Sequence, residues 1–271
     1  MEKITSVHNQ LIKQAIGLRE SPGRREAKMT IIDGTREIMR ALEAGVALER
    51  VFFVQGRQDQ LVRQLSGQGI EAIEVSAQVM EKLDYGQRHE GIVALGHTPY
   101  RALKDLKLSS QPLVVVLESL EKPGNLGAIL RTCDGVGIEA VLVCDPQTDV
   151  YNPNVIRSST GVIFKVPVVC AQAEEIFSFL KSRKIKICAT TPAASKLYTH
   201  ADFKGAWAVV LGSEEAGLSD FWLLAAHVTV KIPMNGIADS LNVSISAAVI
   251  LYEILRQRQE VKDAFTSFFG P

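Results

Sequence analysis

The chain has 271 residues, of which 46% are hydrophobic, and it carries 30 basic and 30 acidic residues. This length suits one large or two medium domains. The balanced charge is not that of a strongly basic nucleic-acid-binding protein, so any RNA contact must come from a local patch. No apolar run approaches the roughly 18 residues of a membrane span, and no signal peptide is apparent, which predicts a cytoplasmic protein without a membrane partner.

The first hundred residues alternate between predicted helices and strands. An amphipathic helix within residues 1–28 comes first, and short apolar runs bounded by Gly or charge then predict strands. The strands are expected at 29–32, 51–54, 70–75 and 91–95, and the helices at 35–44, 58–65 and 77–83. This alternation predicts a compact α/β domain over residues 1–98, followed by a polar linker over 99–111.

Basic side chains gather at two places in this first domain. Arg24, Arg25 and Lys28 lie close together near its start, and Arg88 and His89 lie in a later turn. Clustered cations neutralise RNA phosphates, so all five are candidate RNA contacts. Ordinary solvated turns are the alternative interpretation at both places. The domain has no catalytic constellation of its own.

Residues 112–271 predict a second α/β domain of about six strands. Uninterrupted apolar runs favour strands that are covered on both faces, as in a parallel sheet. The strands are expected at 113–117, 140–144, 165–169, 185–189, 207–211 and 228–232, and the helices at 126–136, 155–160, 174–182 and 240–257. Polar, glycine-containing bends follow several strands, at the edge where ligands bind in such sheets.

These bends carry a polar set without histidine. Arg131 offers a fixed positive fork suited to phosphate, although pairing with Asp134 one turn on is an equal alternative. Gly212 and Gly217 let the backbone bend closely around a ligand, or serve plain turns. Ser240 is expected to cap the last helix, with Asn242 in its first turn. The full set is Asn125, Arg131, Glu214, Ser240 and Asn242.

Several common chemistries lack their motifs. The phosphate loop GxxxxGK[ST], the dinucleotide motif GxGxxG after a strand, the GxSxG elbow and HExxH do not occur. The four cysteines form no CxxC pair and are interpreted as reduced core thiols, so no metal site is expected. The four are Cys133, Cys144, Cys170 and Cys188.

Three segments in order carry a family resemblance. They are NLGAILR at 125–131, LGSEEAGLS at 211–219 and IPMNGIADSLNVS at 232–244. Together they resemble the SpoU (also called TrmH) family of RNA 2′-O-ribose methyltransferases, in the SPOUT superfamily. The resemblance covers 113–256 closely. It extends more weakly over 1–97, where IIDGTREIMRAL and RHEGIVAL are similar to the RNA-binding domain that precedes the catalytic domain in many members.

The resemblance implies a fold and a cofactor. The second domain would be a SPOUT α/β-knot, with a deep trefoil knot that forms the S-adenosylmethionine pocket, an exception to the rule that chains do not thread loops. Members work as homodimers with the site near the interface. By position, the cofactor-binding residues would be Thr190, Leu211, Gly212, Gly217, Ile232, Met234 and Leu241.

The resemblance also implies roles for the polar set. Asn125, Arg131, Glu214, Ser240 and Asn242 match the family's catalytic and RNA-contacting positions. The family proposal makes Arg131 the activator of the ribose hydroxyl. Because a guanidinium has a pKa above about 12, we instead expect Arg131 to grip the adjacent phosphate and stabilise the forming alkoxide.

Two departures from the family pattern leave the target open. Lys122 precedes Pro123, where many relatives have an acid. The segment RSSTGVIFKVPVV resembles the family's RNA-side segment, which adds Arg157 to the candidate RNA contacts, but Val162 replaces a common small polar residue. The leading hypothesis is an enzyme that methylates large-subunit (23S) ribosomal RNA. A transfer-RNA enzyme, a drug-resistance methyltransferase and a non-catalytic RNA-binding protein of the same fold are the alternatives.

Overall fold

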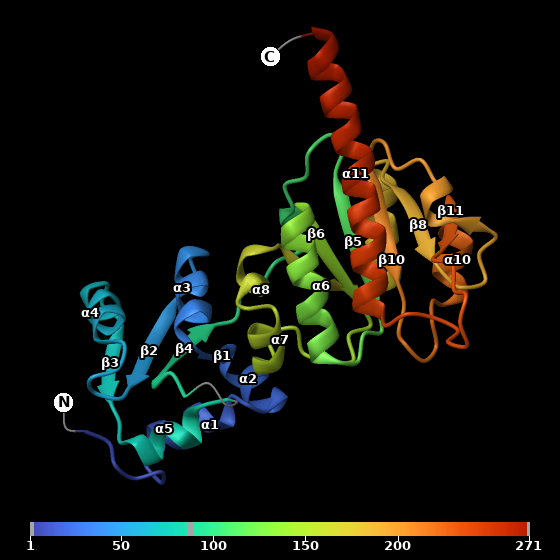
Figure 1. The fold of residues 1–271 in the computed structure, drawn as a ribbon. Helices are drawn as coiled ribbons and strands as arrows, with labels where there is room; N and C mark the ends of the chain where they lie inside the picture. Colours follow the sequence, from blue (N-terminus) through green and yellow to red (C-terminus); the bar gives the residue numbers. More distant parts are fainter. Residues whose placement is uncertain (1–2, 86–88, 270–271) are drawn as a thin grey trace. The chain divides into compact units, whose positions relative to one another are not determined.

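The computed structural model describes residues 3–85 and 89–269, with side chains described up to residue 259 (Figure 1). The chain forms two compact units. The first comprises Met1–Tyr100 and Asp149–Lys165, and the second comprises Arg101–Thr148 and Val166–Pro271. The change at Tyr100 falls in the linker expected from the sequence. Residues 149–165, however, pack with the first unit, whereas the boundaries expected from the sequence place them in the second domain.

The first unit is built on a four-stranded sheet of order β1-β4-β2-β3, in which β4 runs antiparallel to both neighbours and β2 runs parallel to β3. The strands are β1 (Met29–Asp33), β2 (Leu48–Phe53), β3 (Glu71–Glu74) and β4 (Ile92–His97). The helices are α1 (Gln10–Gly17), α2 (Ser21–Ala27), α3 (Thr35–Glu43), α4 (Asp59–Gly67), α5 (Ala77–Leu83), α7 (Pro153–Ser158) and α8 (Val162–Lys165). The predicted α/β alternation is confirmed.

Capping explains where several of these helices begin. The Ser76 hydroxyl accepts from the backbone N–H of Val79 at 3.3 Å, and α5 covers the range expected for it. Asn9 caps α1, whose first residue is Gln10, although the polar Ser6 is an alternative cap by composition. Residues 21–27 form α2, although the sequence analysis treats this stretch as a turn. A proline in its first turn and the left-handed Lys28 after its end suit a short helix.

The second unit contains a seven-stranded, wholly parallel sheet of order β7-β6-β5-β10-β8-β11-β9. The strands are β5 (Leu113–Glu118), β6 (Ala140–Cys144), β7 (Val168–Ala171), β8 (Lys186–Thr190), β9 (Lys196–Leu197), β10 (Trp207–Leu211) and β11 (Val228–Lys231). The six expected strands are present. The one expected at 165–169 starts later because Lys165 still belongs to α8, and the two-residue β9 is too short for its composition to reveal it.

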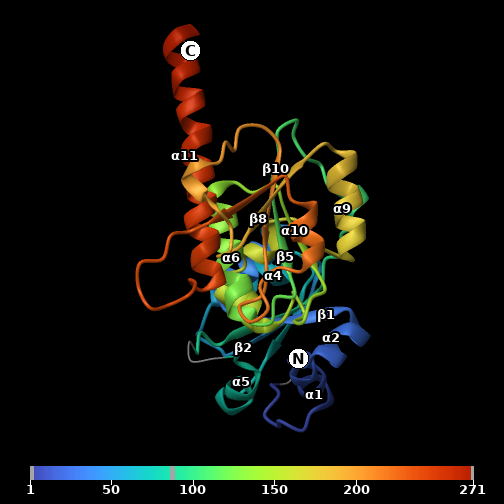
Figure 2. The same ribbon diagram turned by 90° about the vertical axis from the view of Figure 1, so that its right-hand side faces the viewer.

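Helices cover both faces of this sheet (Figure 2). On one face lie α6 (Pro123–Val136) and α11 (Val243–Phe269), and on the other lie α9 (Ala173–Ser182) and α10 (Asp220–Ala225). Alternate strand residues such as Val114, Val116 and Val210 pack with Leu180 and Trp222 in one buried core. Burial on both faces is the physical reason why these strands read as unbroken apolar runs.

Two 3₁₀ turns, Leu103–Asp105 and Tyr198–His200, complete the described elements. Within the part of the chain that the structure describes, no helix is both long enough and apolar enough to cross a membrane. Cys133, Cys144 and Cys188 are buried free thiols, as expected for core positions, whereas Cys170 is exposed and does not fit that interpretation. Burial raises the pKa of the Cys144 and Cys188 thiols to about 12.

Candidate active site

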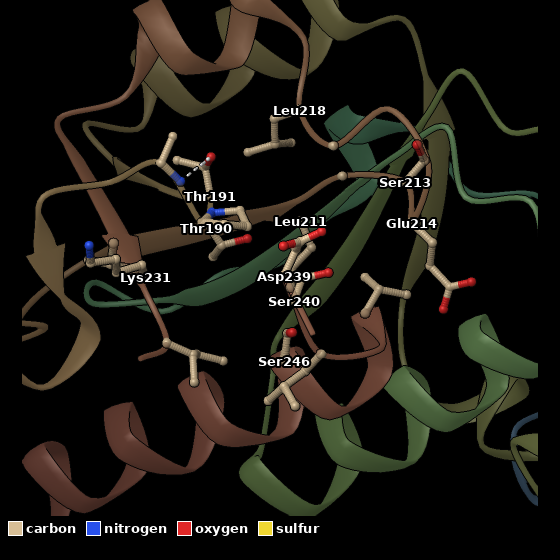
Figure 3. A pocket seen from close by; sticks show the side chains of 18 of the residues that line it. Thr190, Thr191, Leu211, Ser213, Glu214, Leu218, Lys231, Asp239, Ser240 and Ser246 are labelled. Carbon is tan, nitrogen blue, oxygen red and sulfur yellow. Dashed lines mark hydrogen bonds between the residues drawn. The ribbon is translucent and has the colours of Figure 1, made fainter. Parts of the chain in front are cut away.

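A cavity of about 780 Å³ lies at the carboxyl ends of β8, β10 and β11 (Figure 3). Parallel strands bring their carboxyl ends to one edge of a sheet, so three loops that are distant in sequence meet there. The last residues of these strands and the loops that follow them supply most of the lining, and the first turns of α11 supply the remainder. The cavity therefore collects two of the three polar segments predicted from the sequence, those at 211–219 and 232–244.

The loop after β10 closes on itself through its own backbone. The N–H of Ser213 donates to the carbonyl of Gly217 at 3.1 Å, and the N–H of Gly217 donates back at 3.2 Å. A Cβ placed on Gly212 would lie 2.0 Å from the Gly217 carbonyl oxygen, and Gly217 has φ +69°. Both positions thus require glycine for the shape of the loop itself.

A buried acid anchors the end of this loop to the neighbouring strand. Glu118, at the carboxyl end of β5, is only 6% exposed. Its two oxygens accept from the backbone N–H of Ser219 at 2.8 Å and from the Ser219 hydroxyl at 2.6 Å. Neither residue is among the site residues predicted from the sequence. The available signal was a carboxylate that ends an otherwise apolar strand, since a buried charge needs fixed partners.

All seven residues predicted to bind a cofactor line this cavity. They are Thr190, Leu211, Gly212, Gly217, Ile232, Met234 and Leu241. Several polar lining residues were not predicted, although most of them directly follow a strand or adjoin a predicted residue. These are Thr191, Ser213, Glu215, Lys231, Asp239 and Ser246. In Figure 3, Asp239 and Ser240 lie centrally, Lys231 lies at one end of the cavity, and Glu214 lies at the end nearest α6.

Glu214 is the centre of a polar network that joins the three sequence motifs. One of its oxygens, Oε1, accepts from Asn125 Nδ2 at 3.0 Å and also from Asn242 Nδ2. The other oxygen pairs with the Lys122 ammonium. Asn242 Nδ2 lies 3.3 Å from Asn125 Oδ1 as well. The three predicted residues Asn125, Glu214 and Asn242 are thus in direct contact, and Lys122 is an additional member.

The Lys122 pair determines the charge state of this network. The hydrogen bond from Lys122 is the main cause that lowers the pKa of the Glu214 carboxyl below its ordinary value, with a smaller effect from Asn125. The same hydrogen bond raises the pKa of the Lys122 ammonium. Glu214 is therefore an anion at neutral pH, which makes it a poor proton donor there.

The cap of the last helix differs from the prediction. The helix begins at Val243, and the Asn242 side-chain carbonyl accepts from the Ser244 N–H at 3.0 Å and from its hydroxyl at 2.6 Å. Asn242 is therefore the capping residue, and the expectation that Ser240 caps this helix is wrong. Ser240 lies two residues earlier and lines the cavity instead.

Arg131 lies away from the cavity of its own chain. It is exposed on α6, a turn and a half beyond Asn125, and it is not among the lining residues. Within residues 3–85 and 89–269, its guanidinium makes no hydrogen bond or ion pair, so the alternative pairing with Asp134 is not found. A free guanidinium fork on this surface is available to an external anion.

The structure gives one predicted RNA contact a different role. Arg24 is only 2% exposed. Its Nε donates to Asp149 Oδ2 at 2.6 Å, and its Nη1 donates to the carbonyls of Leu18 and Arg19 at 3.0 and 2.6 Å. A buried guanidinium with three partners holds the first unit together and is not open to a phosphate.

The remaining predicted RNA contacts are spread over the first unit. Arg25 and Lys28 are exposed. His89 Nδ1 lies 3.2 Å from Asp84 Oδ2, and the half-buried Arg157 donates to the Tyr85 carbonyl at 3.3 Å. Arg88 lies outside the described residues. Among the side chains that are described, no group of three or more His, Cys, Asp or Glu could hold a metal ion.

Comparison with known proteins gives this geometry a family. The model of the SpoU rRNA Methylase family matches residues 112–252, and the model of the MRM3-like substrate binding domain matches residues 9–94. The first match spans more than half of the chain. The protein therefore belongs to the SpoU rRNA methylase family, with an MRM3-like substrate-binding domain before the catalytic one.

Three similar proteins illustrate the family. A solved RNA 2′-O ribose methyltransferase is 42% identical, with a TM-score of 0.84 over 95% of this chain and 100% of its own. An AdoMet-bound rRNA methyltransferase from Sinorhizobium meliloti is 26% identical, with a TM-score of 0.87 over 94% of this chain and 97% of its own. The 23S rRNA (uridine(2479)-2′-O)-methyltransferase of Streptomyces viridochromogenes is 32% identical, covering 68% of this chain and 67% of its own.

Proposed function

We propose that this protein transfers a methyl group from S-adenosylmethionine to a ribose 2′-hydroxyl of RNA, with 23S ribosomal RNA as the substrate. The observation that carries the proposal is the convergence of all three family motifs at the cavity. Two of them form its walls, and Asn125 of the other joins Glu214 and Asn242 at the end nearest α6. The relatives that act on 23S rRNA or carry AdoMet support the substrate and the cofactor.

The cavity has the composition that an adenosine-containing cofactor needs. Apolar side chains from Leu211, Ile232 and Leu241 would cover a flat base, and hydroxyls such as those of Thr190 and Ser246 lie among the lining residues. A volume of about 780 Å³ falls within the range of cofactor pockets. When bound, S-adenosylmethionine supplies a sulfonium-activated methyl group for in-line attack by the hydroxyl.

The chain itself supplies positioning and electrostatics. Glu214, held as an anion by Lys122, fixes the amides of Asn125 and Asn242. These amides would orient the ribose, and Ser240 contributes a hydroxyl from the cavity wall. Arg131 binds the phosphate beside the target and stabilises negative charge on the attacking oxygen, because its fork matches phosphate oxygens in pairs.

The enzyme acts as a homodimer through the outer surface of α6 and α11. The two helices pack side by side (Figure 1). Gly135 of α6 lies so close to Tyr252 of α11 that a Cβ on Gly135 would be 3.0 Å from the Tyr252 hydroxyl. Ile245 and Tyr252, one heptad apart on α11, are 52% and 53% exposed. Arg131 lies one turn from Gly135 on the same side of α6, so a second copy at this surface would bring Arg131 near the partner's cavity.

The remaining proposals concern the chain path and the place of reaction. Because the loop after β10 and the segment 232–242 line the same cavity, we assign to them the trefoil knot expected of the family. For a 23S rRNA substrate, we propose that the reaction takes place in the cytoplasm. A transfer-RNA substrate is the second candidate, since relatives are also named tRNA/rRNA methyltransferases.

The test is transfer of radiolabelled methyl from S-adenosylmethionine to unmodified 23S rRNA and, separately, to transfer RNA, followed by mapping of alkali-resistant linkages. Label at one ribose of 23S rRNA is expected, and Arg131→Ala should remove it. Label in transfer RNA alone would mean that the proposed reaction is correct but that the substrate is transfer RNA. Absence of label together with no calorimetric binding of S-adenosylmethionine would overturn the proposal in favour of a non-catalytic RNA-binding protein.

A further inference from the structure

The turn between α9 and β8 carries an unusual concentration of positive charge. Four cations occur within six residues, and all four side chains are exposed. They are Lys181, Arg183, Lys184 and Lys186. The chain as a whole has equal numbers of basic and acidic residues, so this local excess is not a consequence of composition. We call these four residues and the exposed Lys204 the α9–β8 basic patch.

Trp207 connects Lys204 to the other members. The Lys186 ammonium lies 5.3 Å from the centre of the Trp207 ring, and the indole N–H donates to the Lys204 carbonyl at 3.1 Å. Trp207 and Lys186 are also paired residues at the starts of β10 and β8. The patch therefore combines two loops at one edge of the sheet.

Aromatic rings underlie most of the patch. Lys181 lies 6.0 Å from the centre of the Phe177 ring, and Arg183 lies 5.5 Å from that of Phe179. Both rings are only partly buried. Cations held over aromatic faces keep their positive charge while losing freedom of movement, so they form a more defined surface than free lysines do.

Carboxylates do not neutralise this charge. Within the described residues, the five cations form no ion pair with an acid. The nearest acid in sequence is Asp202, whose Oδ1 accepts from the Lys204 backbone N–H at 3.0 Å. Glu174 and Glu175 lie in the first turn of α9, at the opposite end of that helix.

The patch is at the opposite edge of the sheet from the cavity. Lys186 begins β8 and Thr190, which lines the cavity, ends it. Four steps of about 3.3 Å along a strand separate the two by roughly 13 Å. A single nucleotide in the cavity would not reach the patch, whereas a folded RNA would extend over it.

We propose that the α9–β8 basic patch is a second RNA-binding surface of the catalytic unit, which contacts the phosphate backbone of the structured RNA whose target ribose enters the cavity. The inference rests on the proposed function for the nature of the polyanion. Exposed cations interleaved with aromatic rings suit phosphates and unpaired bases, and they carry no information about sequence. The patch would therefore strengthen binding without selecting the target.

Binding and methylation, measured separately, test this surface. The probe is a fluorescent transcript of unmodified 23S rRNA, titrated over a series of salt concentrations. Replacing Lys181, Arg183, Lys184 and Lys186 together by Gln should weaken binding by tenfold or more at ~0.1 M salt. It should also reduce the slope of log K against log salt by about 3, because each phosphate contact contributes about 0.7 to 0.9. The KM for RNA should rise while kcat at saturating RNA and affinity for S-adenosylmethionine stay unchanged.

Two matched controls locate the effect. Lys181→Arg, Lys184→Arg and Lys186→Arg together preserve charge and should keep the wild-type salt slope. Lys184→Gln should reduce the slope by about 1, whereas Lys196→Gln, an equally exposed cation on the edge strand β9, should not. Melting temperatures close to that of the wild type would show that these variants fold.

An unchanged salt slope in the fourfold Gln variant would overturn the inference. Patch-dependent binding to phosphatidylglycerol vesicles without any effect on RNA binding would overturn it as well, since the partner would then be an anionic surface of another kind. If the wild-type protein methylates no RNA but its RNA binding depends on the patch, the proposed function fails, and the patch stands as an RNA-binding surface without a methylation target.

Discussion

Asn125 donates a hydrogen bond of 3.0 Å to Glu214 across 89 positions of the sequence. This contact places the start of α6 against the loop that follows β10. Since Asn242 donates to the same carboxylate oxygen, one acid holds two amides that come from opposite ends of the catalytic domain. Glu214 is consequently a structural centre of the site as well as a charged member of it.

Glu214 should act as a permanent anion and not as a general base. Its pKa is lowered chiefly by the hydrogen bond from Lys122, so it is charged throughout the neutral range. Glu214→Gln keeps an acceptor for the amides but loses the ion pair, and we expect methyl transfer to fall by about tenfold or more at every pH from 6 to 9. Single-turnover rates measure this. Glu215→Gln, at the neighbouring lining position, is the control. An inflection in the wild-type profile of rate against pH that disappears only in Glu214→Gln would contradict the assignment of Glu214 as a permanent anion.

Two substitutions of Asn242 should separate its role in capping the helix from its role in the site. Asn242→Ser retains a good helix cap but loses the amide that reaches Glu214, so its stability should change little while methyl transfer falls by tenfold or more. Asn242→Ala loses the cap as well and should cost about 1 kcal/mol in the free energy of unfolding. Denaturation and activity of both variants provide the comparison. Equal stability of the two variants would argue against capping by Asn242.

Gly212→Ala should damage the cofactor pocket directly. The added Cβ would meet backbone atoms of the same loop at 2.0–2.6 Å, so the loop must open. We expect calorimetry to show at least tenfold weaker binding of S-adenosylmethionine, with a lower melting temperature. Gly67→Ala is the matched control because a Cβ there has nothing within 4 Å. Cofactor binding that survives in Gly212→Ala would mean that the closed loop is not part of the pocket.

Arg131→Lys tests whether the paired donors of a guanidinium are needed at this position or whether a positive charge alone is sufficient. Because Arg131 is exposed and makes no bond within the described residues, its replacement should leave folding and cofactor affinity unchanged. Lysine keeps the charge but not the paired donors, so we expect single-turnover methyl transfer to fall by at least tenfold across the pH range. Near-full activity of the lysine variant would disprove bidentate phosphate binding.

The raised pKa of Asp33 predicts how the stability of the first unit depends on pH. Burial, as the largest cause, raises its pKa from 3.8 to about 6, with contributions from Asp84, Glu90 and Glu37. Because Asp33 holds its proton more tightly in the folded state, protonation of Asp33 stabilises the fold. This contribution is complete below about pH 4 and is lost as pH rises to about 6. Asp33→Asn can still accept from the Tyr85 N–H, which Asp33 does at 2.9 Å.

Between pH 4 and pH 7, the free energy of unfolding of the asparagine variant should therefore rise by about 1–2 kcal/mol relative to that of the wild type, allowing for partial solvent screening. Urea denaturation at both pH values measures the difference. Glu90→Gln serves as a comparison, because that side chain also accepts from a backbone N–H, at Thr35. A constant difference between Asp33→Asn and wild type at all pH values would refute the raised pKa.

The sequence predicted the parts of the fold that depend on local pattern. Buried strands such as β6 and β10 have unbroken apolar composition, and their predicted bounds agree with the structure. The start of α11 was misplaced because Ser240 and Asn242 are equally good caps in composition. Only the direction of the chain after β11 decides between them.

The network around Glu214 marks the limit of sequence reasoning for the site. Motif positions identified Asn125, Glu214 and Asn242, yet the partner Lys122 was noted only as a departure from the family. Arg24 is predicted as an RNA contact because it clusters with Arg25 and Lys28 in the sequence, whereas in the structure it is buried and pairs with Asp149, 125 positions away. Long-range pairing of this kind leaves no periodic signal in one sequence.

The assignment of residues 149–165 to the first unit changes what can be exchanged between enzymes of this kind. The chain passes from one unit to the other three times, after Tyr100, after Thr148 and after Lys165. The Thr30 hydroxyl donates to the Tyr151 carbonyl at 2.9 Å, so the returning segment completes the unit that β1 begins. A gene fusion that transplanted only the first hundred codons would leave this piece behind. Moving the first unit intact to another enzyme therefore requires both of its coding segments, those for residues 1–100 and 149–165.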